Sequence, residues 1–152
     1  MRAAPILLLL LAAVWGCDGA ASRWIDQARA ANAQADAAGE EGAATRALED
    51  LVSRPPPAGV AAQDARAVLQ DAWGRLASLA LRAGRPEIAL RRADAGLLLG
   101  EGRDVFTSSL RILRGRALEA LGREAEAAGD YQEAQAILAG LLDEAMGDGG
   151  AR

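Results

Sequence analysis

The side chains that could carry chemistry are carboxylates, arginines and a few hydroxyls, because the 152-residue chain contains no histidine. Histidine is the commonest general base, so Ser108 and Ser109 lack the partner that would activate them as nucleophiles. Adjacent carboxylates occur as the pairs Glu40–Glu41, Glu49–Asp50 and Asp143–Glu144. Neighbouring side chains on a helix point about 100° apart, so these pairs do not converge on one substrate atom.

Other kinds of site are also unsupported. The chain has no glycine-rich phosphate loop, and its acidic residues lack the spacing of a metal-binding loop. The net charge is −4, with arginines and acids interspersed, and the aromatic residues are only three tryptophans, one tyrosine and one phenylalanine. That pattern argues against a nucleic-acid partner. The sequence therefore predicts no catalytic residue, no metal and no cofactor.

Cys17, the only cysteine, follows the apolar run AAPILLLLLAAVW, which one arginine precedes. The run has the length of a signal-peptide core and is short for a membrane span. The stretch VWGC resembles the lipobox of bacterial lipoproteins, with an aliphatic residue at −3 and a small residue at −1. The resemblance implies that residues 1–16 are a cleaved signal peptide and that Cys17 carries lipid. Residues 17–22 would then be a lipidated N-terminus and short tether.

One position departs from the lipobox. Trp15 stands at −2, where a small residue is usual, so an uncleaved apolar anchor with a spectator thiol is the alternative. Either arrangement implies a bacterial envelope protein anchored to a membrane and facing the periplasm or the exterior. Asp18 resembles the enterobacterial signal for retention in the inner membrane, a rule that varies between bacteria, so the choice of membrane stays open.

The elements that must position these residues are predicted to be helices throughout. Hydrophobic residues make up 51% of the chain but aromatics only 3%, so the core must consist of alanine and leucine, which suits closely packed helices. The expected helices are 20–38, 42–53, 60–83, 86–99, 104–121 and 124–146. Residues 23–146 would form one all-α domain, and residues 147–152 a disordered tail.

Three similar stretches recur along this domain, each with a glycine followed five residues later by an alanine. The spacings between the glycines are 84 − 39 = 45 and 122 − 84 = 38 residues. Such intervals are typical of stacked helical hairpins, in which glycine ends one helix and alanine allows the next to approach closely. The three pairs are Gly39 with Ala44, Gly84 with Ala89, and Gly122 with Ala127.

The stretches resemble the tetratricopeptide repeat, a helix–turn–helix of about 34 residues. The matching positions are Trp73, Leu76, Ala77, Gly115, Leu118, Tyr131 and Ala134. Arg114 departs from the pattern, since the family has leucine there. The resemblance implies a right-handed helical-hairpin solenoid of about three repeats. The alternative is a plain antiparallel bundle with alanine-rich seams.

In the tetratricopeptide family the first helix of each repeat lines a concave surface that binds extended or helical protein segments. The residues that this resemblance places at a partner-binding surface are Arg75, Ser78, Arg82, Ile112, Arg116 and Glu119. Guanidinium groups pair bidentately with carboxylates, so the arginines would be the main contacts. The competing interpretation is that they are solvated or pair within the array, as Arg116 could with Glu119, three residues on.

The function expected from the whole sequence is therefore a membrane-anchored, non-catalytic interaction module, an accessory subunit of a larger envelope assembly. The alternative is a structural or self-associating helical lipoprotein that uses no peptide-binding groove. Trp73 is expected to pack between the helices of its own repeat. Trp24 is expected to pack in the core or to touch the membrane interface.

Overall fold

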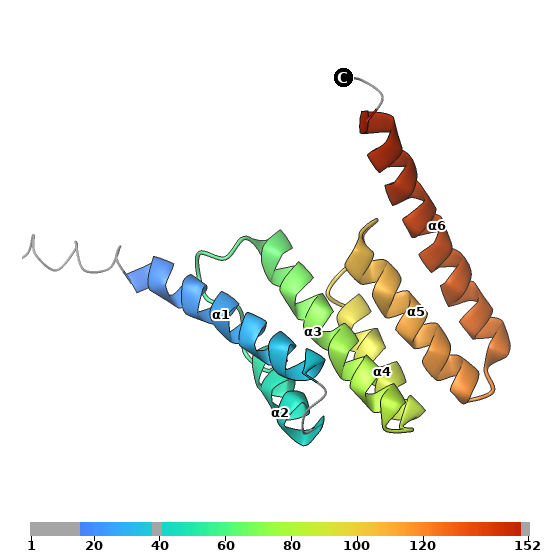
Figure 1. Cartoon of the computed structure of the whole chain (residues 1–152), viewed down its shortest axis with the longest axis horizontal. Helices are drawn as coiled ribbons and strands as arrows, with labels where there is room; N and C mark the ends of the chain where they lie inside the picture. Colours follow the sequence, from blue (N-terminus) through green and yellow to red (C-terminus); the bar gives the residue numbers. More distant parts are fainter. Residues whose placement is uncertain (1–15, 38–40, 150–152) are drawn as a thin grey trace, which may run out of the picture.

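A computed structural model describes residues 16–37 and 41–149, which form six α-helices and contain no strand. The helices are α1 (Gly16–Asp36), α2 (Glu41–Val52), α3 (Ala62–Arg82), α4 (Pro86–Leu97), α5 (Val105–Ala120) and α6 (Glu124–Gly149) (Figure 1). All six expected helices are present, and their ends differ from the expected ones by at most four residues. The prediction of an all-α chain is confirmed for these residues.

Two helices extend beyond their expected ends. The first begins at Gly16 rather than at residue 20, so residues 17–22 lie within α1, and α6 continues through residues 147–149. Both differences are extensions of a helix that already exists, which avoids the cost of nucleating a new one. The rest of the expected signal peptide and tail, residues 1–15 and 150–152, lies outside the described residues.

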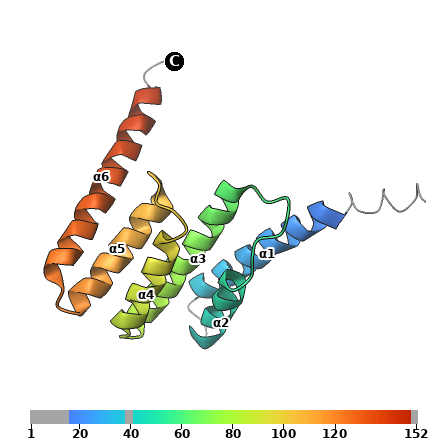
Figure 2. The same ribbon diagram turned by 180° about the vertical axis from the view of Figure 1, so that it is seen from behind.

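The helices pack sequentially, as three antiparallel hairpins α1–α2, α3–α4 and α5–α6. Each first helix also contacts the first helix of the next hairpin, α1 with α3 and α3 with α5. Among the described residues, the backbones of α2 and α4 do not approach each other, although Arg92 of α4 pairs with Glu49 of α2 at 2.6 Å, and the backbones of α4 and α6 do not approach each other. Figures 1 and 2, seen from opposite sides, show α1, α3 and α5 side by side. The first helices therefore form one continuous layer.

The second and third hairpins turn in the same way. Gly84 and Gly122 both have a positive φ, 68° and 73°, as predicted for the glycine that ends each first helix. The following residue donates its backbone N–H to the carbonyl five residues earlier, Arg85 to Ala80 and Arg123 to Leu118, each at 2.9 Å. This is the Schellman arrangement of a helix C-terminus. Gly39 lies outside the described residues.

The core consists of alanine and leucine, as the composition predicts. Among the described residues, every buried hydrophobic side chain except that of Trp24 belongs to one of these two. The three alanines that follow the repeated glycines, Ala44, Ala89 and Ala127, are 4%, 0% and 2% exposed, so the helices approach closely where larger side chains would separate them. Trp24 is 6% exposed within the cluster that joins α1, α2 and α3, which favours packing over a membrane contact.

Candidate partner-binding groove

A groove runs along the layer of first helices, between α3 and α5. One part, with a volume of about 420 Å³, is lined by Gln70, Asp71, Gly74, Arg75 and Ser78 of α3 and by Val105, Phe106, Ser109, Leu110, Ile112 and Leu113 of α5. The adjoining part, about 410 Å³, is lined by Ser78, Leu81, Arg82, Arg116, Glu119 and Ala120. Ser78 borders both parts, so they adjoin, and together they are called the groove.

The structure brings all six predicted partner-binding residues together in this groove. Arg75 and Ile112 line the first part, Arg82, Arg116 and Glu119 line the second, and Ser78 lines both. Every lining residue belongs to α3 or α5. No described residue of α1 or α6 lines either part of the groove.

Arg75 forms ion pairs within the chain. Its guanidinium donates to Asp71 of the same helix at 3.0 Å and to Asp36 of α1 at 2.5 Å, and Asn32 donates to Asp71 at 2.8 Å. Partial burial acts to lower the pKa of Arg75, but the hydrogen bonds to Asp71 and then Asp36 raise it above its ordinary value. Arg75 therefore joins α1 to α3.

Arg82 and Arg116 differ from Arg75. Both are exposed, and neither has a carboxylate within 4 Å among the described residues. The pairing of Arg116 with Glu119 that the sequence suggested is not formed. Instead the Tyr131 hydroxyl of α6 donates to Glu119 at 2.7 Å. Burial and then this hydrogen bond raise the pKa of Tyr131 to about 12. The two exposed guanidinium groups are therefore available to carboxylates of a partner.

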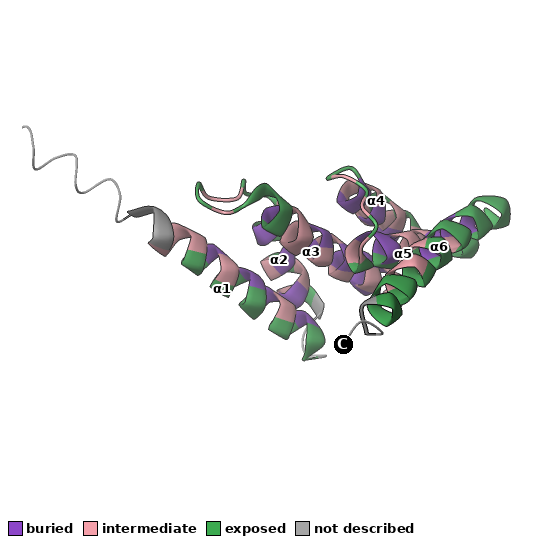
Figure 3. Ribbon diagram, turned by 90° about the horizontal axis from the view of Figure 1, so that it is seen from above, coloured by how far each residue is buried: buried purple, intermediate pink, exposed green. Residues whose placement is uncertain are grey.

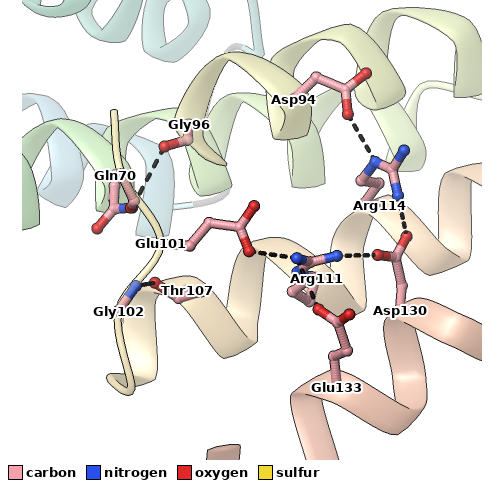
Figure 4. A network of polar contacts seen from close by, with 11 residues as sticks. Gln70, Asp94, Gly96, Glu101, Gly102, Thr107, Arg111, Arg114, Asp130 and Glu133 are labelled. Atoms are coloured by element: carbon pink, nitrogen blue, oxygen red, sulfur yellow. Dashed lines mark hydrogen bonds and ion pairs between the residues drawn. The ribbon is translucent and has the colours of Figure 1, made fainter. Parts of the chain in front are cut away.

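A cluster of ion pairs on α4, α5 and α6 holds α5 in place (Figure 4). Asp130 of α6 is 2% exposed and accepts from Arg111 at 2.9 Å and from Arg114 at 2.8 Å. Arg114 also donates to Asp94 of α4 at 2.7 Å. Arg111 makes further pairs with Glu101 and with Glu133. Partial burial acts to lower the pKa of both arginines, but hydrogen bonds outweigh it and the pKa of each is raised. The main hydrogen bond is to Asp130 for Arg111 and to Asp94 for Arg114.

The two neighbouring serines at the start of α5 have different surroundings. Ser108 is 1% exposed, and its hydroxyl donates to the Val105 carbonyl at 3.0 Å. The cap of α5 is Asp104, which accepts the backbone N–H of Thr107 at 2.8 Å. Ser109 is exposed and lines the groove.

Sequence reasoning missed several groove residues, including Gln70, Val105 and Phe106. Val105 lies four residues before Ser109 and seven before Ile112, so extending the row of exposed α5 residues by one turn would have found it. Gln70 had no such signal, because its partners are the carbonyl oxygens of Gly96 and Gly100, at 3.3 Å and 2.7 Å, on another segment.

Comparison with protein-family models, curated proteins and solved structures found no match to this chain. Across residues 16–37 and 41–149, no helix is both long and apolar enough to cross a membrane. In the same residues no three His, Cys, Asp or Glu side chains lie together in a way that could hold a metal ion. The fold and the groove are therefore the observations from which a function can be argued.

Proposed function

We propose that this chain is a membrane-anchored, non-catalytic protein-interaction module of the bacterial envelope, an accessory subunit of a larger assembly. Its partner, an extended or helical protein segment, lies in the groove between α3 and α5. The observation that carries the proposal is that this groove is lined, among the described residues, by α3 and α5 alone and ends at two exposed arginines without carboxylate partners, Arg82 and Arg116.

The proposal includes a right-handed solenoid of about three tetratricopeptide-like repeats. It is supported by the two identical Schellman turns, 122 − 84 = 38 residues apart, by the buried alanine that follows each turn, and by the continuous layer of first helices. Arg114, which replaces the leucine of the family pattern, is compatible with this packing because Asp94 and Asp130 neutralise it.

Anchoring is the second part of the proposal. The lipobox-like VWGC implies a diacylglycerol on Cys17 and acyl transfer to its amine, and several acyl chains hold a protein stably on a membrane. Cys17 lies in the first turn of α1, and α1 packs directly on α2 and α3. The lipid would therefore be attached to the helical array itself, without an intervening linker.

Affinity capture from the native envelope tests the binding part. An Arg82→Ala/Arg116→Ala variant should capture at least about tenfold less partner, because a charged hydrogen bond contributes about 1.5–3 kcal/mol. The matched control is Arg46→Ala/Arg91→Ala, which removes the same charge from exposed positions on α2 and α4. Equal capture by wild type and both variants would refute the groove as the binding surface.

A structural, self-associating lipoprotein is the second candidate, and one observation favours it. Leu138, Leu142 and Met146 lie four residues apart on α6 and are 43%, 58% and 63% exposed, which forms an apolar stripe on one side of the helix. If this stripe joins copies of the chain, Leu138→Ser/Leu142→Ser should convert an oligomer to a monomer in light scattering. A wild-type monomer would rule this candidate out.

A further inference from the structure

The groove between α3 and α5 changes its chemistry along its length. Its first part is walled by apolar side chains of α5, which are Val105, Phe106, Leu110, Ile112 and Leu113. Gly74 of α3 lines the same part and adds no side chain, and a Cβ there would still be 3.6 Å from the nearest atom of Leu113. This part, here called the apolar half, therefore leaves room for a large apolar side chain.

Gln70, one of the residues that line the apolar half, has a buried hydrogen-bond acceptor without a donor in the described part of the chain. Gln70 is 1% exposed, and its Nε2 donates to the carbonyl oxygens of Gly100 at 2.7 Å and Gly96 at 3.3 Å. These two acceptors fix which atom of the amide is the nitrogen. Its Oε1 has no hydrogen-bond partner among the described residues. A buried acceptor without a donor is costly, so a ligand that brings an N–H or O–H would be favoured here.

The second part of the groove, here called the cationic half, has the opposite character. Arg82 and Arg116 are exposed there without carboxylate partners, and the one acid that lines it, Glu119, accepts from Tyr131. At 1.5 Å per helical residue, Arg116 lies about 15 Å along α5 from Phe106. The charge of this half is complementary to acidic groups.

We propose that the groove recognises a bipartite segment of its protein partner. A Trp or Tyr side chain enters the apolar half and donates to Gln70, and one or two carboxylates of the same segment pair with Arg82 and Arg116. Trp and Tyr are the side chains that combine a large apolar body with a hydrogen-bond donor. The two features would be about five residues apart in an extended segment and about ten in a helical one. The inference rests on the proposed interaction module and names the chemistry of its partner.

Selection from a random 16-residue peptide display library, with the full chain in detergent as bait, tests the motif. Enriched peptides should contain Trp or Tyr at a constant distance from Asp or Glu. With Arg82→Glu/Arg116→Glu as bait, the enriched peptides should contain Lys or Arg in place of Asp or Glu. They should still contain the Trp or Tyr. A synthetic Trp peptide should bind at least about tenfold more tightly than its Trp→Ala form, and more tightly than its Trp→Phe form.

Two controls keep the outcome clear. Arg46→Glu/Arg91→Glu, on α2 and α4, should enrich the same acidic peptides as wild type, and thermal unfolding of each bait reports whether it is folded. Enrichment without an acidic preference, an unchanged preference after charge reversal, or no enrichment would each overturn the bipartite motif. If the bipartite motif were overturned but capture from the envelope still depended on Arg82 and Arg116, the proposed interaction module would remain supported and only the motif would be rejected.

Discussion

At the scale of single residues, five arginines of α3 and α5 differ in whether a carboxylate of this chain holds them. Arg75, Arg111 and Arg114 are partly buried and held by carboxylates of neighbouring helices, whereas Arg82 and Arg116 are exposed and have no such partners in the described part of the chain. Arginine is the only cation in this sequence, so its presence alone could not distinguish these roles. The distinction depends on the carboxylates that the fold brings near each one.

Asp130 is expected to be the residue on which α5 and α6 depend most. Its replacement by alanine leaves Arg111 and Arg114 partly buried without their shared carboxylate, so the free energy of unfolding should fall by about 3 kcal/mol. Urea unfolding followed by tryptophan fluorescence measures this change. The control Asp143→Ala, at an exposed position on the same helix, should change stability by less than about 0.5 kcal/mol. Equal changes in the free energy of unfolding for the two variants would show that the ion pairs of Asp130 do not contribute to stability.

Tyr131 offers a pH test, because it is the only tyrosine in the chain. Burial and its hydrogen bond to Glu119 raise its pKa to about 12, so the phenolate absorbance should appear near that pH rather than near 10. Since the folded pKa is raised, the stability that this group contributes is complete below about pH 10 and is lost as the pH rises through about 12.

The variant Glu119→Gln should lower the midpoint of the Tyr131 absorbance titration, because it removes the negative charge that opposes the phenolate. Glu124→Gln, at an exposed position where α6 begins, serves as the control and should leave the midpoint unchanged. A wild-type midpoint near 10 would contradict the placement of Glu119 beside Tyr131.

At the scale of helices, close approach depends on small residues at defined positions. Gly115 of α5 faces the ring of Tyr131 on α6, and a Cβ there would lie 2.6 Å from the ring carbon Cε1. Gly115→Ala should therefore lower the free energy of unfolding by about 1–3 kcal/mol, because the ring must move. Gly129→Ala on α6 meets no atom within 4 Å and should stabilise by about 0.5–1 kcal/mol. Stabilisation by both variants, in the same urea experiment, would contradict this packing.

Helix positions could be predicted well from the sequence, because their limits depend on local chemistry. Pro86 begins α4, and Gly84 and Gly122 adopt the positive φ that ends a helix. The beginning of α1 could not be predicted in this way, since the stretch CDGAAS has weak local preferences and joins a helix that packing on α2 and α3 stabilises.

The groove was predictable only in part. The resemblance to the tetratricopeptide repeat placed Arg75, Ser78, Arg82, Ile112, Arg116 and Glu119 on one surface, and the structure brings them together along the groove. The pairing of Arg75 with Asp36 was not predictable, because these residues are 39 positions apart on different helices. The same reason applies to the buried Asp130.

At the scale of the whole molecule, the array has one layer of first helices and a sixth helix that extends beyond its neighbour. Figure 1 shows α6 continuing past the end of α5, and Figure 3 shows that much of its surface is exposed. The groove lies between α3 and α5, so α3 separates it from α1, the helix that contains Cys17. The proposed partner could therefore bind while the proposed lipid at Cys17 holds the chain on a membrane.

Membrane attachment is expected to depend on Cys17. In fractionated cells a Cys17→Ser variant should lose incorporation of an alkyne-labelled fatty acid, and wild type should incorporate it. Because cleavage of a lipoprotein signal peptide follows lipidation, the variant should also keep its full length in mass spectrometry. Fatty-acid labelling of the Cys17→Ser chain, or its absence from wild type, would refute lipidation and favour an apolar anchor.

The claim that the groove between α3 and α5 binds a protein partner is tested most directly by photocross-linking in the native envelope. A photoreactive phenylalanine derivative at Ser109, which is exposed in the groove, should give a cross-linked product with one defined partner. The same group at Arg91, exposed on α4, should not give that product. A product from Arg91 with none from Ser109 would contradict the proposal, because the partner would then contact the opposite layer of the array.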